Sequence, residues 1–327
     1  MPRPATEGGP VPHDLFVCPR CGGGLALTVA AYDCLACGRR YPINGDIPVL
    51  VENTASIEHD ELDHIASHGV QHGQSAKNAH NDAQSAWFDR ETLSEFEIER
   101  PMGSPAFYQF LLGEKFRRSV QPFGGRLDGW TALTVCGGSG MDAEFLARAG
   151  AAVISSDISI GAASRARQRA ERHRVPIVPI VADAEHLPFA DRSMDLVYVH
   201  DGLHHLEDPW AGLAEMARVA RRAVAINEPA QARATAIAVR LGLALEREDA
   251  GNRVARLEPS DVTVALRAAG FNHVRAERYA MYYAHVPGRL MRVLSWKPLR
   301  AVAVAGWRLT NRALGRVGNK LTVVGMR

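Results

Sequence analysis

Residues 129–279 alternate short runs rich in Val, Ile and Ala with segments of helical length, and this alternation constrains the fold more than any other feature of the chain. The predicted strands cover residues 131–136, 152–156, 177–181, 195–199, 223–227 and 272–279, and the predicted helices cover 142–149, 160–172, 209–220 and 258–269. Strands joined by helix-length spacers pair in parallel and carry helices on their faces. We therefore expect an α/β fold with a doubly wound, mostly parallel sheet.

The other segments of the chain differ from this pattern in amino-acid composition. Residues 15–51 are rich in Cys and Gly, and residues 52–128 are polar and carry five of the thirteen histidines. Residues 284–318 are basic and apolar, and an apolar run at 320–326 follows them. We expect a small module at 15–51, a helical lid or linker at 52–128, and a main domain at 129–327 with an insertion at 284–318.

Four of the five cysteines form two CxxC pairs, Cys18 with Cys21 and Cys34 with Cys37, separated by twelve residues. Two such pairs can wrap a tetrahedral Zn²⁺ with four thiolates. Because four thiolates leave no open coordination position, we expect a structural zinc ion rather than one that activates water. Unligated cysteines with incidental spacing are the alternative.

A glycine-rich turn, L-T-V-C-G-G-S-G from Leu133 to Gly140, follows the first predicted strand. Gly138 and Gly140 lack a Cβ, so the backbone can approach a nucleotide-like ligand, and the next helix offers free N–H groups. Asp157 ends the second predicted strand, where a carboxylate can accept two ribose hydroxyls. With Ala143 the turn also satisfies the dinucleotide fingerprint, so an NAD-dependent enzyme is a competing interpretation.

Three later segments favour a different cofactor. They run in order from Ala182 (A-D-A-E-H-L-P-F), from Ser193 (S-M-D-L-V-Y-V-H) and from Leu203 (L-H-H-L-E-D-P). With the glycine turn, this series over residues 130–279 resembles the class I S-adenosylmethionine-dependent methyltransferases of type 11, typified by enzymes of ubiquinone and menaquinone biosynthesis. The resemblance implies a Rossmann-like methyltransferase fold with an antiparallel final strand at 320–326, and S-adenosylmethionine as cofactor.

The resemblance also implies a role for each matching residue. It assigns Asp157 to the ribose, Ile158 to one face of the adenine, and Asp183 with Ala184 to the adenine amino group. His200 and Asp201 would line the pocket near the sulfonium. The predicted cofactor-binding residues are Cys136, Gly137, Gly138, Gly140, Asp157, Ile158, Asp183, Ala184 and His200.

Two positions depart from the family pattern, which has an acid where this chain has Thr134 and a glycine where it has Cys136. Either another group such as Asp142 holds the cofactor amine, or cofactor affinity is weakened. A binding module without catalysis is therefore a further alternative. For Cys136 itself, burial as a small apolar side chain is the simpler interpretation.

Residues 16–51 resemble the zinc-ribbon activator subunit of eukaryotic tRNA and release-factor methyltransferases, both in the CxxC pairs and in the continuation from Arg40 to Leu50. This favours methyl transfer and keeps a tRNA or protein acceptor as an alternative to a small-molecule or lipid-linked one. The segment after Tyr198 reads V-H-D-G-L, without the Pro-Pro-Tyr type of signature that accompanies nitrogen methylation of nucleic acid or glutamine. We do not expect a nucleic-acid partner.

Because the sulfonium is already an activated donor, the protein has mainly to align the acceptor and to remove a proton when the acceptor is a hydroxyl. His204, His205 and Glu228 follow the fourth and fifth predicted strands and are the candidate catalytic residues. Helix capping and packing are the alternative roles for either histidine. We expect transfer to oxygen, with carbon and nitrogen left open.

The polar region at 52–128 offers two further groups of side chains. His64, His68 and His72 recur every four residues, but Gly69 and Gly73 interrupt them. We therefore expect a solvated lid surface there rather than a metal site. The better candidates for contact with the acceptor are aromatic residues closer to the first strand: Trp87, Phe96, Phe107, Tyr108 and Phe110. For Phe107 and Phe110, ordinary packing within the lid is the alternative.

The charge of the chain is distributed unevenly. From Arg278 to Arg327 there are ten Lys or Arg and no acid, which leaves 28 basic against 36 acidic residues before them. Arginines recur at multiples of four from Arg300 to Arg316, as on one helical stripe. Residues 289–316 therefore suit an anionic membrane surface, a roof over the substrate pocket or a dimer contact. No signal peptide or spanning helix is recognisable, so we expect a cytoplasmic protein. If residues 289–316 bind an anionic membrane, the protein is peripheral to that membrane. The oligomeric state is left open.

Overall fold

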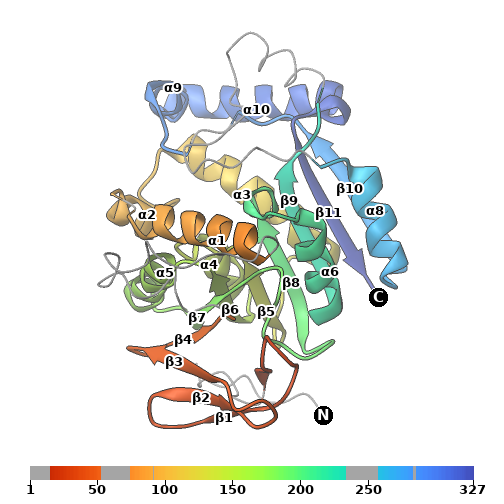
Figure 1. Cartoon of the computed structure of the whole chain (residues 1–327). Helices are drawn as coiled ribbons and strands as arrows, with labels where there is room; N and C mark the ends of the chain where they lie inside the picture. Colours follow the sequence, from red (N-terminus) through yellow and green to blue (C-terminus); the bar gives the residue numbers. More distant parts are fainter. Residues whose placement is uncertain (1–14, 53–73, 91, 233–256, 283–284) are drawn as a thin grey trace.

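The computed structural model describes residues 15–52, 74–90, 92–232, 257–282 and 285–327. Its centre is one sheet with the strand order β1-β2-β3-β4-β7-β6-β5-β8-β9-β11-β10 (Figure 1). The strands are β1 (Leu25–Leu27), β2 (Ala31–Cys34), β3 (Arg40–Asn44), β4 (Ile47–Leu50), β5 (Thr131–Val135), β6 (Ala152–Asp157), β7 (Ile177–Ala182), β8 (Met194–His200), β9 (Ala220–Pro229), β10 (His273–Tyr279) and β11 (Lys320–Met326).

The strands of the main domain pair as predicted. β7, β6, β5, β8 and β9 run parallel to one another, and β11 runs antiparallel to both β9 and β10. The doubly wound, mostly parallel sheet with an antiparallel final strand is therefore confirmed. β9 begins three residues before the predicted start. Its first residues include Arg221, whose side chain lies on Asp195 at 2.7 Å rather than in an apolar core, so hydrophobicity does not mark that end.

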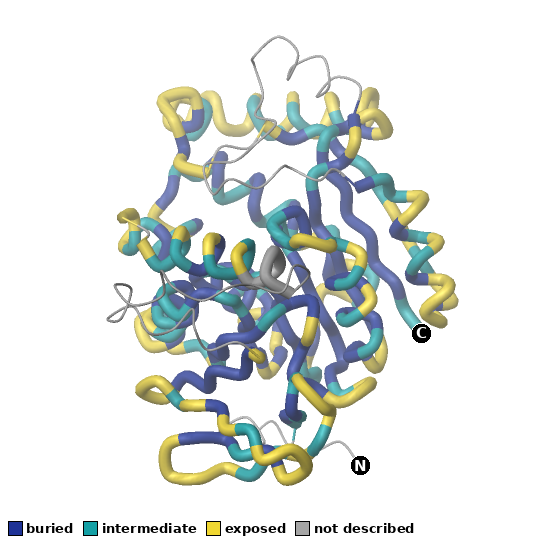
Figure 2. Tube along the Cα trace, in the orientation of Figure 1, coloured by how far each residue is buried: buried dark blue, intermediate teal, exposed yellow. Residues whose placement is uncertain are grey.

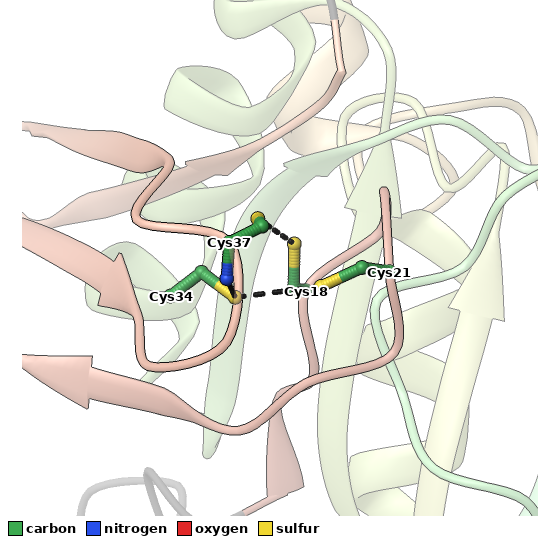
Figure 3. Close-up of side chains that lie close together, drawn as sticks. All are labelled: Cys18, Cys21, Cys34 and Cys37. Carbon is green, nitrogen blue, oxygen red and sulfur yellow. Dashed lines mark hydrogen bonds between the residues drawn. The ribbon is translucent and has the colours of Figure 1, made fainter.

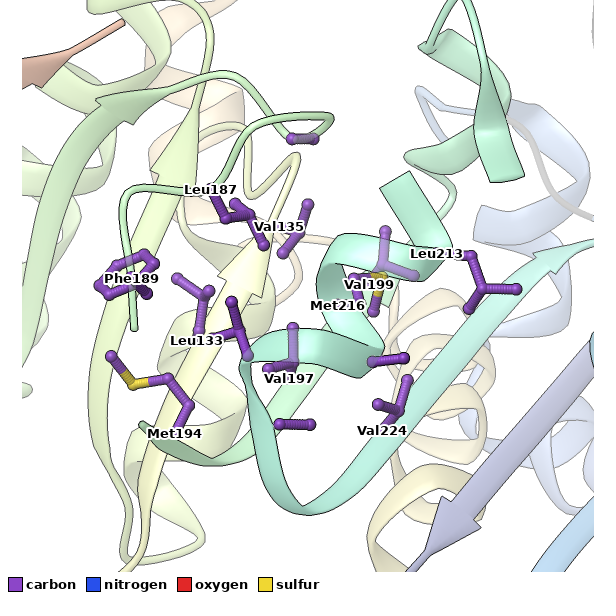
Figure 4. Close-up of a cluster of buried hydrophobic side chains, with 14 of the residues drawn as sticks. Leu133, Val135, Leu187, Phe189, Met194, Val197, Val199, Leu213, Met216 and Val224 are labelled. Carbon is purple, nitrogen blue, oxygen red and sulfur yellow. The ribbon is translucent and has the colours of Figure 1, made fainter. Parts of the chain in front are cut away.

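Alternate residues of the strands build two cores, one on each face of the sheet. One core contains Leu133, Val197 and Val224 and is closed by α6 and α8 (Figure 4). The other contains Ala132 and Leu196 and is closed by α3, α4 and α5. The helices are α3 (Ala106–Val120), α4 (Met141–Arg148), α5 (Ile160–His173), α6 (Pro209–Val219) and α8 (Pro259–Ala268). This three-layer arrangement follows from burying both faces of a parallel sheet.

The N-terminal module extends the sheet of the main domain. β4 pairs in parallel with β7, with Val49 opposite Val181. The Phe16 ring lies 5.6 Å from the Phe189 ring, and Phe16 belongs to the core that α6 closes. The ribbon is therefore joined to the main domain both by backbone hydrogen bonds and by a shared apolar core.

The lid region forms two helices before α3, namely α1 (Gln74–Asp89) and α2 (Ser94–Glu99). α1 is docked on the start of α5, because Asp89 Oδ1 accepts hydrogen bonds from Ser159 Oγ at 2.5 Å and from Gly161 N at 2.8 Å. His64, His68 and His72 lie outside the described residues.

The predicted insertion forms α9 (Arg289–Leu294) and α10 (Lys297–Leu314), followed by the short helix η5 (Gly315–Val317). Both helices lie beyond α3, at the opposite end of the molecule from the ribbon, and much of their surface is exposed (Figures 1 and 2). None of the helices in the described part of the chain combines the length and the apolar character that crossing a bilayer requires.

Candidate functional site

The predicted site residues meet at the edge of the sheet where the parallel strands end. The residues after β5, β6, β7, β8 and β9 all leave the sheet at this edge, because parallel strands share one direction. Ligands of open parallel sheets bind in the crevice outside these carboxyl ends. The topology thus brings together residues that are up to ninety positions apart in the sequence.

The glycine turn after β5 closes on the end of β6. Gly138 has a φ of +51° and donates its N–H to Asp157 Oδ2 at 2.8 Å. A Cβ built on Gly138 meets nothing within 4 Å, so the backbone borders open space there. Gly140 has the different task of packing, because a Cβ at this position would lie 3.0 Å from the Cβ of Ala166 on α5. A ligand can therefore come close to the turn at Gly138.

Asp157 is held from both sides by the backbone. Its Oδ2 accepts from Gly138 N, and its Oδ1 accepts from Ser159 N at 3.0 Å. Burial raises the pKa of Asp157, although these two N–H groups act in the opposite direction. Each carboxylate oxygen can accept a second hydrogen bond, so Asp157 keeps the capacity to receive two hydroxyl groups.

The two departures from the family pattern have a local explanation. Thr134 is buried and donates its hydroxyl to Ser155 Oγ at 3.0 Å, which ties β5 to β6 where an acid would otherwise stand. Cys136 has a φ of +52°, a conformation that favours glycine. Burial raises the pKa of Cys136 well above its ordinary value, with the charge of Asp157 adding to the effect. Cys136 is therefore a neutral thiol on a backbone in the left-handed conformation that glycine usually adopts.

The segment after β7 faces the lid. Asp183 Oδ1 accepts from Glu185 N at 2.9 Å, while Asn81 of α1 lies 3.4 Å from the other oxygen. Ile158 contacts the same helix, since its carbonyl accepts from Ser85 Oγ at 3.4 Å. Ala184 is buried in the core that α6 closes. The lid helix α1 therefore covers the residues that the resemblance assigns to adenine.

The end of β8 carries a network of buried charges. Asp201 has a φ of +48° and binds two lysines, with Oδ2 2.6 Å from Lys115 Nζ and Oδ1 2.9 Å from Lys320 Nζ. His200 donates from Nδ1 to Asp142 Oδ1 at 2.7 Å, and its Nε2 lies 3.3 Å from Asp201 Oδ2. Asp142, put forward above as a partner for the cofactor amine, thus uses one oxygen on His200.

The charged groups in this network shift one another's pKa values. Burial alone would raise the pKa of Asp201, but Lys115, Lys320 and His200 hold it well below its ordinary value. Burial lowers the pKa of Lys115 to about 8, even though Asp201 acts to raise it. Burial also works to lower the pKa of His200, but the carboxylates of Asp142 and Asp201 outweigh it and the pKa is raised.

The two lysines of this network were not among the predicted site residues. Lys115 is completely buried and lies on the inner face of α3 with Tyr108, Leu111 and Leu112. A lysine at a core position of an amphipathic helix is the signal that sequence reasoning missed, because buried lysines need a partner. Lys320 gives no such signal, since it stands at the first position of a strand.

A second histidine–carboxylate pair lies after β8 and β9. His204, in the short helix η4 (Leu203–His205), has Nδ1 2.8 Å from Glu228 Oε2. Glu228 Oε1 accepts from the backbone N–H groups of Gly202 and Leu203, each at 2.8 Å. Glu228 is fully buried, so both its oxygens serve to hold η4 and the His204 ring. Since a carboxylate only accepts, Nδ1 carries the proton and Nε2 is the basic nitrogen of the neutral ring.

His205 lies beside this pair and under the lid. Its ring centroid is 4.4 Å from that of His204 and 5.5 Å from that of Phe88 in α1. Its carbonyl lies 2.7 Å from His80 Nε2, also in α1. His205 therefore contacts the lid helix and His204 lies behind it, while Phe107 and Phe110 pack in a separate cluster with Trp307 of α10.

The four cysteines of the ribbon form a compact cluster (Figure 3). Their sulfur atoms all lie within 4.8 Å of one another, with 3.8 Å between Cys18 and Cys37 and 3.5 Å between Cys21 and Cys34. Zn–S bonds of about 2.3 Å place the corners of a tetrahedron about 3.8 Å apart. The cluster therefore fits a single tetrahedral metal ion of the kind that four thiolates bind.

Comparison with known proteins agrees with this geometry. Residues 133–226 match the model of a family described as a methyltransferase domain. Demethylmenaquinone methyltransferase from Renibacterium salmoninarum is 37% identical over 107 residues, which are 33% of this chain and 44% of that protein. The enzyme of the same name from Corynebacterium urealyticum is 43% identical over 100 residues, 29% of this chain and 40% of that protein. The chain thus spans less than half the length of these relatives.

One solved structure has a similar fold over most of the chain. Magnesium protoporphyrin IX methyltransferase from Synechocystis, with bound SAH, superposes with a TM-score of 0.51 at 17% sequence identity. The match covers 78% of this chain and 99% of that one.

Proposed function

We propose that this chain, which carries a methyltransferase domain over residues 133–226, transfers a methyl group from S-adenosylmethionine to a small-molecule or lipid-linked acceptor. The observation that carries the proposal is the hydrogen bond between Gly138 N and Asp157, with open space at Gly138. It brings the glycine turn and a ribose-binding carboxylate to one edge of the sheet, within the segment that matches the family. The predicted binding roles of Ile158, Asp183, Ala184 and His200 belong to the same proposal.

S-adenosylmethionine, when bound, supplies a methyl group that is already activated by its sulfonium. In this proposal Asp157 holds the ribose hydroxyls, and the backbone at Gly138 borders the methionine end. The lid helix α1 excludes water from the adenine side through its contacts with Asp183 and Ile158. Excluding water and fixing the reacting groups is the main contribution that a protein makes to such a transfer.

His204 is the proposed general base. Glu228 orients the ring through Nδ1, and in this proposal the other ring nitrogen, Nε2, takes a proton from the acceptor, the arrangement by which a buried carboxylate prepares a histidine. Glu228 is then a positioning residue, and His205 is the reserve base. Because a base is needed when the acceptor is a hydroxyl, this pair supports transfer to oxygen.

The proposal includes a structural zinc ion at Cys18, Cys21, Cys34 and Cys37. Its support is the size of the sulfur cluster, which matches a tetrahedral ZnS₄ site. Held there, the ion would stabilise the strands that continue the main sheet through β4.

Binding and transfer measurements on the purified chain test the function. We expect calorimetry to show binding of S-adenosylmethionine, and we expect labelled methyl to pass from it to an acceptor in a lipid extract. Demethylmenaquinone is the first defined acceptor to try, since it stands in the names of the relatives. Binding of NADH with no response to S-adenosylmethionine would overturn the proposal, and binding without transfer to any acceptor would leave a module without catalysis.

A further inference from the structure

The outer side of α9 and α10 is an exposed helical surface whose inner side is already packed. On the inner side, Val304 and Trp307 join the cluster around α3, and Trp307 Nε1 donates to Ala280 O at 3.1 Å. Asn311, one turn farther along, donates to the same carbonyl at 3.0 Å. These contacts fix which side of α10 faces outward.

The outward side carries large apolar residues. Val302 and Leu309 are each 67% exposed and lie seven residues apart, so they project from the same side of α10. Trp296, between the two helices, is 64% exposed, and Leu290 and Val293 of α9 are more than half exposed. Large apolar side chains exposed on two successive helices in this way indicate an interaction surface.

Basic residues accompany these apolar side chains. Residues 289–316 contain seven Lys or Arg and no acid: Arg289, Arg292, Lys297, Arg300, Arg308, Arg312 and Arg316. Within the described part of the chain none of the seven has an ion pair, and all seven are exposed. Arg308 also lies over the Phe110 ring, 5.7 Å from its centroid, and Arg300 stands seven positions before Trp307, on the inner side of α10. We call the seven basic residues, with Leu290, Val293, Trp296, Val302 and Leu309, the basic-apolar face.

We propose that the basic-apolar face docks on a membrane surface that contains anionic phospholipids. An amphipathic helix with arginine beside Trp and Leu lies in the plane of such a surface, with its apolar side among the acyl chains and its charges at the phosphates. A second copy of the chain is a poor occupant, because it would bring seven positive charges against seven. Nucleic acid would match the charges but would leave Val302, Leu309 and Trp296 unused.

Vesicle flotation of the full chain tests this inference. We expect the wild type to float with vesicles that contain phosphatidylglycerol at low salt, to stay behind with pure phosphatidylcholine, and to be released at about 0.5 M salt, where charges are screened. The double variant Arg308→Glu, Arg312→Glu should bind anionic vesicles at least about tenfold more weakly. The variant Val302→Ser, Leu309→Ser should also bind more weakly, because the apolar side contributes to insertion.

A matched control changes the same charge elsewhere. Arg174→Glu with Arg267→Glu alters two exposed arginines, one directly after α5 and one on α8, and should float like the wild type. Failure of the wild type to float, or equal flotation of the wild type and the Arg308/Arg312 variant, would overturn the inference. So would full binding by the Val302/Leu309 variant, or a dimer in light scattering that the same substitutions dissociate. None of these outcomes depends on methyl transfer.

Discussion

Asp157 and Asp183 are each held by a backbone N–H two residues farther along the chain, whereas Asp201 is held by lysines 86 and 119 residues away. The first two belong to the glycine-loop half of the sheet, which consists of β4, β7, β6, β5 and their loops. The third belongs to the histidine half, which consists of β8, β9, β11, β10 and their loops. Local turns hold part of one half of the site, whereas the carboxylate of the other half is held by side chains that only the fold brings together.

The two halves also differ in what stabilises their outer edge. Beyond β4 the glycine-loop half continues into the short strands of the ribbon, where β1 and β3 have few buried residues. Beyond β9 the histidine half continues into β11, where six of the seven residues are buried, and it ends on β10, where Val274 packs against the core that α8 closes. The ribbon edge therefore carries the cysteine cluster, while the other edge rests on apolar packing under α8. Four predictions sharpen or break this comparison.

Replacing Cys34 with Ser should have the largest effect, confined to the glycine-loop half. Structural zinc contributes about 10–16 kcal/mol to the folding of small metal-bound units, so residues 15–51 should unfold and expose the edge of β7. Elemental analysis should find about one zinc per wild-type chain and none in the variant, and limited proteolysis should cut the variant before residue 52.

Cys136→Ser is the matched control for this change, since Cys136 lies outside the cluster and should leave the zinc content unaltered. A soluble Cys34→Ser protein without zinc whose ribbon still resists protease would contradict the proposed role of the metal.

Replacing Asp157 with Ala should weaken the binding of S-adenosylmethionine and change the histidine half little. Each hydrogen bond from a ribose hydroxyl to the carboxylate contributes about 1.5–3 kcal/mol, so affinity should fall by roughly ten- to a hundredfold or more. Calorimetry measures this directly. Asp191→Ala removes an exposed carboxylate elsewhere and should bind like the wild type; equal affinity of all three proteins would remove Asp157 from the cofactor site.

Replacing His204 with Ala should lower turnover and change cofactor affinity little, the converse of the effect expected at Asp157. A general base contributes roughly 10²–10⁴-fold to the rate, and Glu228→Gln should reproduce part of the loss by disturbing the ring that it orients. Initial rates with a hydroxyl acceptor provide the measurement, and His273→Ala, an exposed histidine on β10, is the control. Full turnover by His204→Ala would mean either that His205 is the general base or that the reaction needs no general base.

The smallest expected effect is the contribution of His200 to the pH dependence of the free energy of unfolding. Its folded pKa is raised by Asp142 and Asp201 against burial and Lys115, so the folded state binds its proton more tightly than the unfolded state. The resulting stabilisation is complete below about pH 6.5 and is lost as the pH rises through the folded pKa. Urea unfolding of the wild type and of His200→Gln should show a difference in free energy that shrinks as the pH rises above about 6.5. A difference that grows with pH would mean that burial outweighs the carboxylates.

The sequence was sufficient for the fold because its signals are local. Each predicted strand is a run of five to eight residues, and each run and each helical spacer can be recognised within its own segment. Their order along the chain leaves few topologies for a parallel sheet. The same holds for Cys18 and Cys34, whose CxxC pairs carry their own geometry. The sequence did not show that the ribbon continues the main sheet, because the pairing of Val49 with Val181 joins segments 132 residues apart.

For the site, the sequence by itself predicted Gly138, Asp157 and the histidines after β8 as candidates, since each follows a strand end in a recognisable order. Only the tertiary structure decided what holds them. It paired His204 with Glu228 and His200 with Asp142, and it placed Lys115 of α3 against Asp201. Such pairs are set by where helices pack on a sheet, and a charge can be stable in a buried position only after the packing has brought its partner within hydrogen-bonding distance.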